Sequence, residues 1–102
     1  MASRLELHEE LCELLGTRNV YFQPPESIKL SYPCIKYSKT GVDKRNANNR
    51  PYKSIKEYGI IVIDPNPDSN ISDRILNHFS MCRFDREYTT DNLNHTSLTL
   101  YY

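Results

Sequence analysis

The sequence predicts an α+β fold, in which a mostly antiparallel β-sheet of about five strands carries two helices on one face. Three observations lead to this prediction. The chain opens with leucines at helical spacing, its middle holds a run of β-branched residues at 60–63, and its end alternates between polar and apolar residues. With 102 residues and 38% hydrophobic content, the chain has room for one modest core, so we expect residues 1–102 to form a single domain.

The first predicted helix spans residues 3–15. Ser3 and Glu6 have the spacing of a capping box, and Gly16 suits the position directly after the last helical turn. The apolar residues recur at the spacing of one buried helix face, and they are Leu7, Leu11, Leu14 and Leu15. The glutamates between them are therefore expected to face outward.

The second predicted helix begins at Ser69, a good N-cap residue, and ends near Phe79. Ile71, Ile75 and Phe79 are four apart, which places them on one face. Asp73 lies near the helix N-terminus, where a negative charge is favoured by the helix dipole. We expect this helix to pack on the same face of the sheet as the first.

The central strand is predicted at residues 58–63, within the most apolar run of the chain. Its successive β-branched residues fit a strand that is covered on both faces. Two prolines in residues 64–67 end this strand, because they remove backbone donors and fix two φ angles. Strands are also predicted at residues 20–23 and 27–37, and Pro33 marks the second as an edge strand or a bulged one.

The C-terminal part predicts a hairpin of strands 81–88 and 96–102, joined by a polar turn at 89–95. Strict alternation assigns one face to Cys82, Phe84 and Tyr88, and the other to Arg83, Asp85 and Glu87. Asp85 and Glu87 would then share a face, where two carboxylates can hold a divalent metal or act as acid and base. The neighbouring arginines favour a surface ion-pair network instead.

A long hairpin loop is predicted at residues 38–56, and the basic residues of the chain gather there. The net charge is zero, yet residues 39–56 hold six basic and one acidic residue, whereas residues 57–102 hold three basic and seven acidic ones. Such a segment indicates a contact surface for phosphates or for an acidic protein partner, with a solvated loop as the simplest alternative. The candidate contact residues are Lys39, Lys44, Arg45, Asn46, Asn48, Asn49, Arg50, Lys53 and Lys56.

No motif in the sequence predicts catalysis or a bound cofactor. His8 and Cys12 are four apart on the first helix, and Cys34 and Cys82 are able to complete a zinc site, but no other element carries a ligand pair at the usual short spacing. The three glycines are isolated, which argues against a phosphate-binding loop. We therefore expect a protein that is not an enzyme, has no metal or cofactor, and keeps its three cysteines as buried thiols in a reducing compartment.

Three stretches of the chain, residues 19–37, 58–76 and 84–102, are distinctive as a set. Their most characteristic pieces are Tyr32-Pro33-Cys34-Ile35, Asp64-Pro65-Asn66-Pro67-Asp68 and Asp91-Asn92-Leu93-Asn94-His95. Together these stretches resemble the tail terminator, or tail completion, family of tailed bacteriophages. None of them is a catalytic motif, so the resemblance concerns the pattern of nearly the whole chain.

The resemblance implies a structural virion protein that forms a ring, usually a hexamer, at the end of the tail tube. Such a ring stops tube polymerisation and offers the surface that joins the head, while DNA passes through its lumen without sequence-specific binding. The implied partners are further copies of the chain, the tail tube protein and neck or head-completion proteins, with no membrane and no cofactor. The implied location is the tail or neck of the virion, after assembly in the host cytoplasm.

Within this reading, we expect the basic residues of 39–56 to guide docking on the tube protein or a neighbouring subunit, above all Lys44, Arg45 and Arg50. Three alternatives stay open. The chain is compatible with a head-completion or neck connector subunit, with a nucleic-acid-binding module that uses residues 39–56, and with a metal-dependent enzyme built on Asp85 and Glu87.

Overall fold

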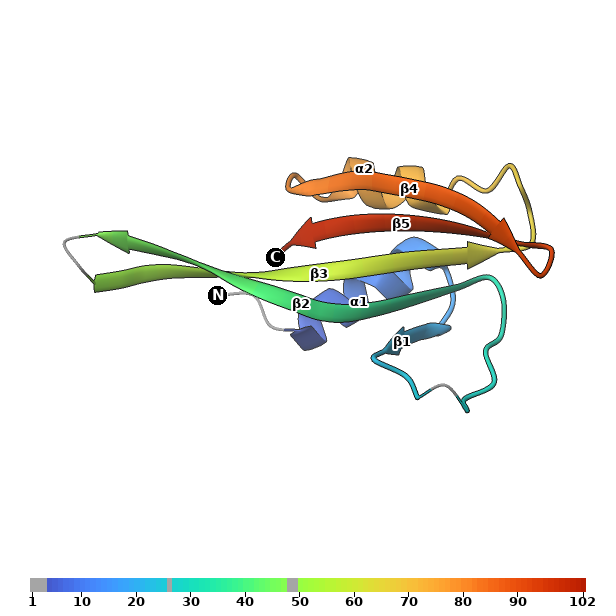
Figure 1. Cartoon of the computed structure of the whole chain (residues 1–102), viewed down its shortest axis with the longest axis horizontal. Coiled ribbons are helices and arrows are strands. Elements are labelled where there is room, and N and C mark those ends of the chain that lie inside the picture. Colours follow the sequence, from blue (N-terminus) through green and yellow to red (C-terminus); the bar gives the residue numbers. More distant parts are fainter. Residues whose placement is uncertain (1–3, 26, 48–49) are drawn as a thin grey trace.

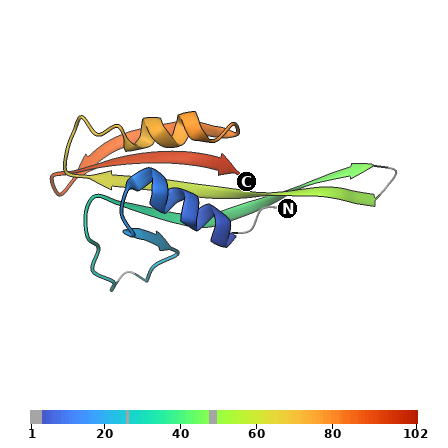
Figure 2. The same cartoon turned by 180° about the vertical axis from the view of Figure 1, so that it is seen from behind.

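The chain forms a five-stranded sheet that carries both helices on the same face (Figures 1 and 2). The computed structural model describes residues 4–25, 27–47 and 50–102, and from residue 42 to residue 55 only the backbone is described. The elements are α1 (Arg4–Leu15), β1 (Val20–Phe22), β2 (Cys34–Ala47), β3 (Arg50–Asp64), α2 (Ile71–His78), β4 (Cys82–Thr90) and β5 (Leu93–Tyr101). The predicted α+β class is therefore confirmed.

The strand order across the sheet is β1-β2-β3-β5-β4, so β3 lies at its centre. Only the β1–β2 pair is parallel among the described strands, and the other neighbours are antiparallel. The predicted central strand is confirmed within β3, which pairs with β5 from Glu57 to Asp64. Its two faces differ: Ile60 and Val62 are buried under the helices, whereas on the opposite face Ile63 is buried and Ile61 is only half-buried. The predicted cover on both faces therefore holds at Ile63 but not at Ile61.

The core lies between the two helices and the sheet. In α1 the buried face includes Cys12 as well as the expected leucines, and Leu14 is only partly buried. The largest fully buried side chains of this core are Tyr37, Tyr58, Leu7, Leu11, Ile35, Ile60, Ile75, Leu98 and Leu100, whereas the fully buried Cys34 lies on the opposite face of β2. Two tyrosines are thus core residues, and Tyr37 keeps its hydroxyl hydrogen-bonded to the His8 Nδ1 at 2.8 Å.

The ends of the helices follow the local sequence in part. Gly16 closes α1 with a φ of +88°, and its N–H donates to the carbonyl of Cys12 at 2.9 Å. Ser3, the N-cap residue of the predicted capping box, lies outside the described residues. The N-cap of α2 is Asn70 and not Ser69, whose hydroxyl instead accepts a long 3.4 Å hydrogen bond from the N–H of Ile71.

The strand predicted at residues 27–37 is shorter than expected. Strand β2 begins at Cys34, directly after Pro33, whose peptide bond with Tyr32 is cis. Residues 27–32 do not join the sheet. Pro33 offers no backbone donor, and the N–H of Ser31 donates instead to the hydroxyl of Tyr21 at 3.3 Å.

The prediction that residues 38–56 join two antiparallel strands as a long hairpin is confirmed, but most of the segment is not a loop, because β2 continues to Ala47 and β3 starts at Arg50 as a paired two-stranded ribbon. The pairing runs from Gly41 with Glu57 to Ala47 with Arg50, with register shifts after Lys39 and Arg45. Backbone pairing needs no apolar side chain, so a polar segment extends a ladder that the core has already set in register. We call residues 42–55 the arm.

The arm projects from the body of the molecule and makes it elongated (Figure 1). The radius of gyration is 14.6 Å, against about 13 Å for a compact domain of this size. Beyond Glu57 the β5 strand no longer accompanies β3, apart from the backbone pair between Lys56 and Tyr102. An isolated two-stranded ribbon is marginally stable in water, so the arm is an element that benefits from a partner surface.

The turn predicted at residues 89–95 is tighter than expected. Strand β4 reaches Thr90 and β5 starts at Leu93, so only Asp91 and Asn92 connect them. Their φ values are +53° and +61°, which is the geometry of a type I′ hairpin turn. Asparagine and aspartate tolerate this left-handed conformation better than most residues.

We expect Asn92→Ala to lower the free energy of unfolding by about 1 kcal/mol, because alanine must adopt a left-handed conformation that its Cβ disfavours. The matched variant Asn92→Gly should be as stable as the wild type or slightly more stable. Urea unfolding monitored by circular dichroism checks both. Equal midpoints for the alanine variant and the wild type would contradict the assigned turn geometry.

Candidate functional site

A β-bulge in β4 decides which side chains face the helices. The register between β4 and β5 shifts between Phe84 and Arg86, so that Phe84 pairs with Leu98 and Glu87 pairs with Thr96. Leu98 and Thr96 are two apart on β5 and both lie on the helix-covered face. Phe84 and Glu87 therefore share that face, and the predicted assignment of Glu87 to the opposite face is wrong.

The bulge also separates the two carboxylates that the sequence places together. Asp85 lies on the open face, where its Oδ2 accepts a hydrogen bond from the Thr99 hydroxyl and its Oδ1 accepts one from the Arg83 Nε at 3.0 Å. The hydrogen bond from Thr99 and then the guanidinium of Arg83 hold the pKa of Asp85 below its usual value. The expected ion-pair network is confirmed for Asp85, whereas Glu87 belongs to a different site.

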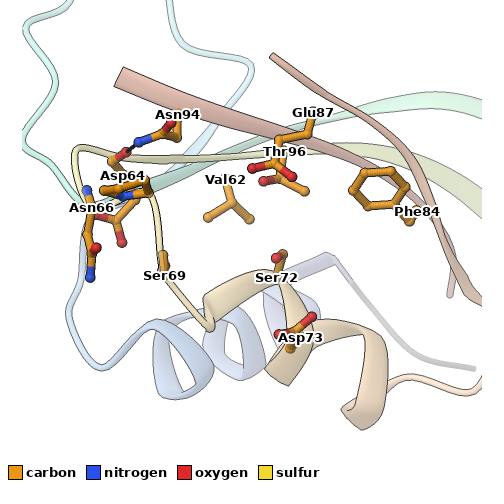
Figure 3. A pocket seen from close by; sticks show the side chains of 11 residues that line it. Val62, Asp64, Asn66, Ser69, Ser72, Asp73, Phe84, Glu87, Asn94 and Thr96 are labelled. Carbon is orange, nitrogen blue, oxygen red and sulfur yellow. Dashed lines mark hydrogen bonds between the residues drawn. The ribbon is translucent and has the colours of Figure 1, made fainter. Parts of the chain in front are cut away.

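That site is a pocket of about 190 Å³ between the N-terminal half of α2 and the helix-covered face of the sheet (Figure 3). One end of the pocket is formed by Asp64, Asn66, Pro67, Ser69 and Asn94. The remaining wall comes from Val62, Ser72, Asp73, Phe84, Glu87 and Thr96.

One end of the pocket is held rigidly by hydrogen bonds. The N–H of Asn66 donates to the Asp64 Oδ1 at 2.8 Å, and the N–H of Asp68 donates to the Asn66 Oδ1 at 3.0 Å. The side-chain amide of Asn94 donates to the carbonyl of Asp64 at 3.1 Å, which ties β5 to the end of β3. The double-proline segment is thereby fixed as the end wall.

The other wall carries polar groups without partners. Thr96 is only 9% exposed and points into the pocket, and its hydroxyl has no hydrogen-bond partner within the described residues. Every fully enclosed side-chain oxygen or nitrogen of the described residues has a hydrogen-bond partner. The Thr96 hydroxyl, which has none, must therefore be accessible from the pocket. In the same described part of the chain, Asp73 and Glu87 form no ion pair.

This arrangement suits a long side chain that ends in a cation. Val62 and the half-exposed Phe84 offer apolar surface for an aliphatic stem. Asp73 and Glu87 offer carboxylates, and the hydroxyls of Ser72 and Thr96 offer further acceptors, for an ammonium or guanidinium group. The pocket escaped prediction because strict alternation, which the bulge breaks, assigns Phe84 and Glu87 to opposite faces.

The predicted basic residues lie elsewhere, on and beside the arm. Lys39 is exposed at its base, where its N–H donates to the Gln23 Oε1 at 3.3 Å, and Lys56 pairs through its backbone with Tyr102. The arm backbone carries Lys44, Arg45, Asn46, Arg50 and Lys53, and Asn48 and Asn49 lie outside the described residues. The paired ends of β2 and β3 that carry the described positions project from one end of the molecule, and the segment between β3 and α2, which contributes residues to the pocket, lies at the other end (Figure 1).

The candidate zinc ligands have other surroundings. His8 is engaged with Tyr37, and Cys12 and Cys34 are buried, with burial raising the pKa of the Cys34 thiol to about 11. Cys82 is only partly buried. Within residues 4–25, 27–47 and 50–102, no group of three or more histidine, cysteine or acidic side chains is placed to hold a metal ion.

Comparison with known protein families finds no family model that matches this chain, and comparison with curated proteins finds no match. Neither helix of the described residues is long and apolar enough to cross a membrane. The functional argument therefore depends on the arm, on the pocket and on the resemblance carried by the sequence.

Proposed function

We propose that this protein is a structural virion subunit of the tail terminator type. Copies of the chain form a ring, most simply a hexamer, that caps the phage tail tube, ends tube polymerisation and offers the head–tail joining surface. The resemblance of residues 19–37, 58–76 and 84–102 to that family supports this proposal. On this view the protein has no enzymatic activity or cofactor and resides in the tail or neck of the virion.

The observation that carries the proposal is the arm. A small sheet with a modest core extends two of its strands into a ribbon of about 20 Å that β5 does not accompany. Such a ribbon gains stability by lying on another protein, and a head-to-tail contact of this kind closes into a ring when the rotation between subunits allows. The partners that follow are neighbouring subunits, the tail tube protein and neck proteins.

The arm also favours a second candidate function. Four of the residues in 42–55 are basic and one is acidic, so the arm is able to lie along a nucleic-acid backbone. A nucleic-acid-binding module predicts affinity for DNA that falls steeply with salt, because each neutralised phosphate releases counterions. A neck connector subunit would also form a ring, and it would differ from the terminator by binding to heads instead of tails.

The test is the native mass of the purified protein at several concentrations, alone and with tail tube protein. A ring, or a monomer that becomes a ring on the tube, supports the terminator function. Co-purification with tail-less heads instead of tails favours the neck connector. A monomer indifferent to tube protein, with salt-dependent DNA binding, overturns the proposal in favour of the nucleic-acid-binding module.

Charge reversal in the arm should disrupt assembly. The variant Lys44→Glu/Arg45→Glu/Arg50→Glu is expected to reduce tail joining by at least about tenfold, since the arm then repels an acidic docking surface. The control Lys29→Glu reverses an exposed charge outside the arm and should join tails normally. In vitro complementation of terminator-deficient tails measures both. Normal joining by the arm variant would show that its charges do not guide docking.

A further inference from the structure

None of the described residues that line the pocket beside the bulge is a lysine or an arginine. The arginines nearest to it in sequence are engaged on β4 itself, Arg83 with Asp85 and Arg86 over the ring of Tyr88 at 4.9 Å. Arg74 of α2 donates to the carbonyl of Leu14 at 3.1 Å. The carboxylates of Asp73 and Glu87, together with the hydroxyl of Thr96 that opens onto the pocket, are therefore available to a group from outside the described chain.

We propose that this pocket receives a lysine or arginine from the arm of a second copy of this chain. The contact deepens the ring assembly proposed above and rests on it. The aliphatic stem of the incoming side chain lies along Val62 and Phe84, and its cation meets Asp73, Glu87 and the hydroxyl of Thr96. The arm backbone then lies outside the pocket, across the α2–β4 side of the neighbouring subunit.

Charge complementarity selects a second copy as the occupant. The arm holds four basic residues and one acidic residue, whereas residues 57–102, which supply every wall of the pocket, hold three basic and seven acidic residues. Three of these acids, Asp64, Asp73 and Glu87, line the pocket itself. An arm and a pocket of opposite charge on the same chain steer copies toward each other and disfavour arm-to-arm contacts.

The placement of the two features favours a head-to-tail contact. The arm leaves the sheet at one end, and the segment between β3 and α2 lies at the other end (Figure 1). Asn66, Pro67 and Ser69 of that segment line the pocket. Donor and acceptor are therefore different surfaces, which is the condition for a heterologous interface that propagates around a ring. In a closed ring every arm and every pocket is occupied.

Side-chain insertion suits this edge of the sheet better than addition of another strand. Strand β4 is an edge strand, but a bulge interrupts its ladder at Phe84 and Arg86, and five successive residues from Arg83 to Glu87 are exposed. Bulges and charges at an edge hinder the pairing of further strands. The bulge that hinders pairing of a further strand with β4 also turns Phe84 and Glu87 toward the pocket.

The experiment uses two full-length variants and their mixture. The arm variant Lys44→Glu/Arg45→Glu/Arg50→Glu keeps the pocket, and the pocket variant Asp73→Lys/Glu87→Lys keeps the arm. Each variant alone is expected to self-associate at least about tenfold more weakly than the wild type in sedimentation equilibrium. The two variants mixed in equal amounts should associate, because the intact arm of the pocket variant binds the intact pocket of the arm variant. High salt should weaken this contact.

Two further variants separate docking from folding. Thr96→Val keeps the shape of the side chain and removes the hydroxyl, so it should leave the thermal midpoint equal or higher while weakening self-association about tenfold. Glu13→Lys makes the same charge change as Glu87→Lys on the exposed side of α1, outside the pocket, and should associate like the wild type.

The outcomes distinguish this inference from the proposed function. If the pocket variants self-associate like the wild type while the arm variant does not, the arm docks elsewhere, and the inference is overturned although the ring proposal stands. A mixture that stays monomeric, or a wild type that shows no self-association up to about 1 mM, also overturns the inference. Rings that form as described but do not bind tails leave the arm–pocket contact in place and overturn only the terminator function.

Discussion

Replacing Ile60 with alanine is expected to lower the free energy of unfolding by about 3–5 kcal/mol, which is a large part of the stability of a domain this small. Ile60 is fully buried in the middle of β3, the central strand, between Tyr37 on β2 and Leu98 on β5. The substitution removes buried apolar volume and leaves a cavity that the two flanking strands are too constrained to fill. Urea unfolding measures the loss.

Ile61→Ala is the matched control, because it removes the same atoms one residue along the same strand. Ile61 points to the open face and is only half-buried, so we expect a loss of about 1 kcal/mol. A difference of at least about 2 kcal/mol between the two variants supports a β3 strand that is covered more fully at Ile60 than at Ile61. Equal losses would mean that Ile61 is covered as fully as Ile60.

Removal of the arm is expected to abolish self-association and tail joining while the body stays folded. Residues 43–55 are replaced by Asn-Gly, so that Val42 and Lys56, which are paired in the native register, flank a two-residue hairpin turn. The described core comes from α1, β1, α2, β5 and the inner parts of β2, β3 and β4, which this change retains. The free energy of unfolding of the monomer should therefore change by no more than about 1 kcal/mol.

Circular dichroism and urea unfolding check the body of the shortened chain, and sedimentation equilibrium checks its association. The wild-type chain at the same concentration is the reference. A shortened chain that still forms rings would show that the ring interface lies on the body, and the arm would then be free to contact the tube. A shortened chain that fails to fold would contradict the view of the arm as an independent extension.

The elements with strong local signals were predictable. Helix α1 was indicated by its leucine spacing and by Gly16 at its end, and the central strand by the β-branched run before the double-proline segment. Each signal comes from residues that are close together in the sequence. Both signals reflect local physics, because helical periodicity and proline stereochemistry act over a few residues. The predicted class, with both helices on one face of a largely antiparallel sheet, follows from them.

Two features depended on pairing between distant residues. The arm lacks apolar content and so has the composition of a loop, but its strands continue a register that the core fixes between Cys34 and Ile63. The pocket depends on one extra residue in β4, which reverses the faces of Glu87 and Tyr88 relative to simple alternation. Alternation in one strand contains no information about a bulge that forms against its neighbour.

The sequence by itself determined the charge of the arm, the two helices, the central strand and the fold class, because these depend on residue type and local spacing. Only the tertiary structure decided that residues 41–47 and 50–57 form a paired ribbon and that Asp85 and Glu87 point to opposite faces. It also decided that Thr96, Glu87, Phe84 and Asp73 meet around one pocket. The physical reason is that register and bulges arise from hydrogen bonding between strands, and they set which distant side chains become neighbours.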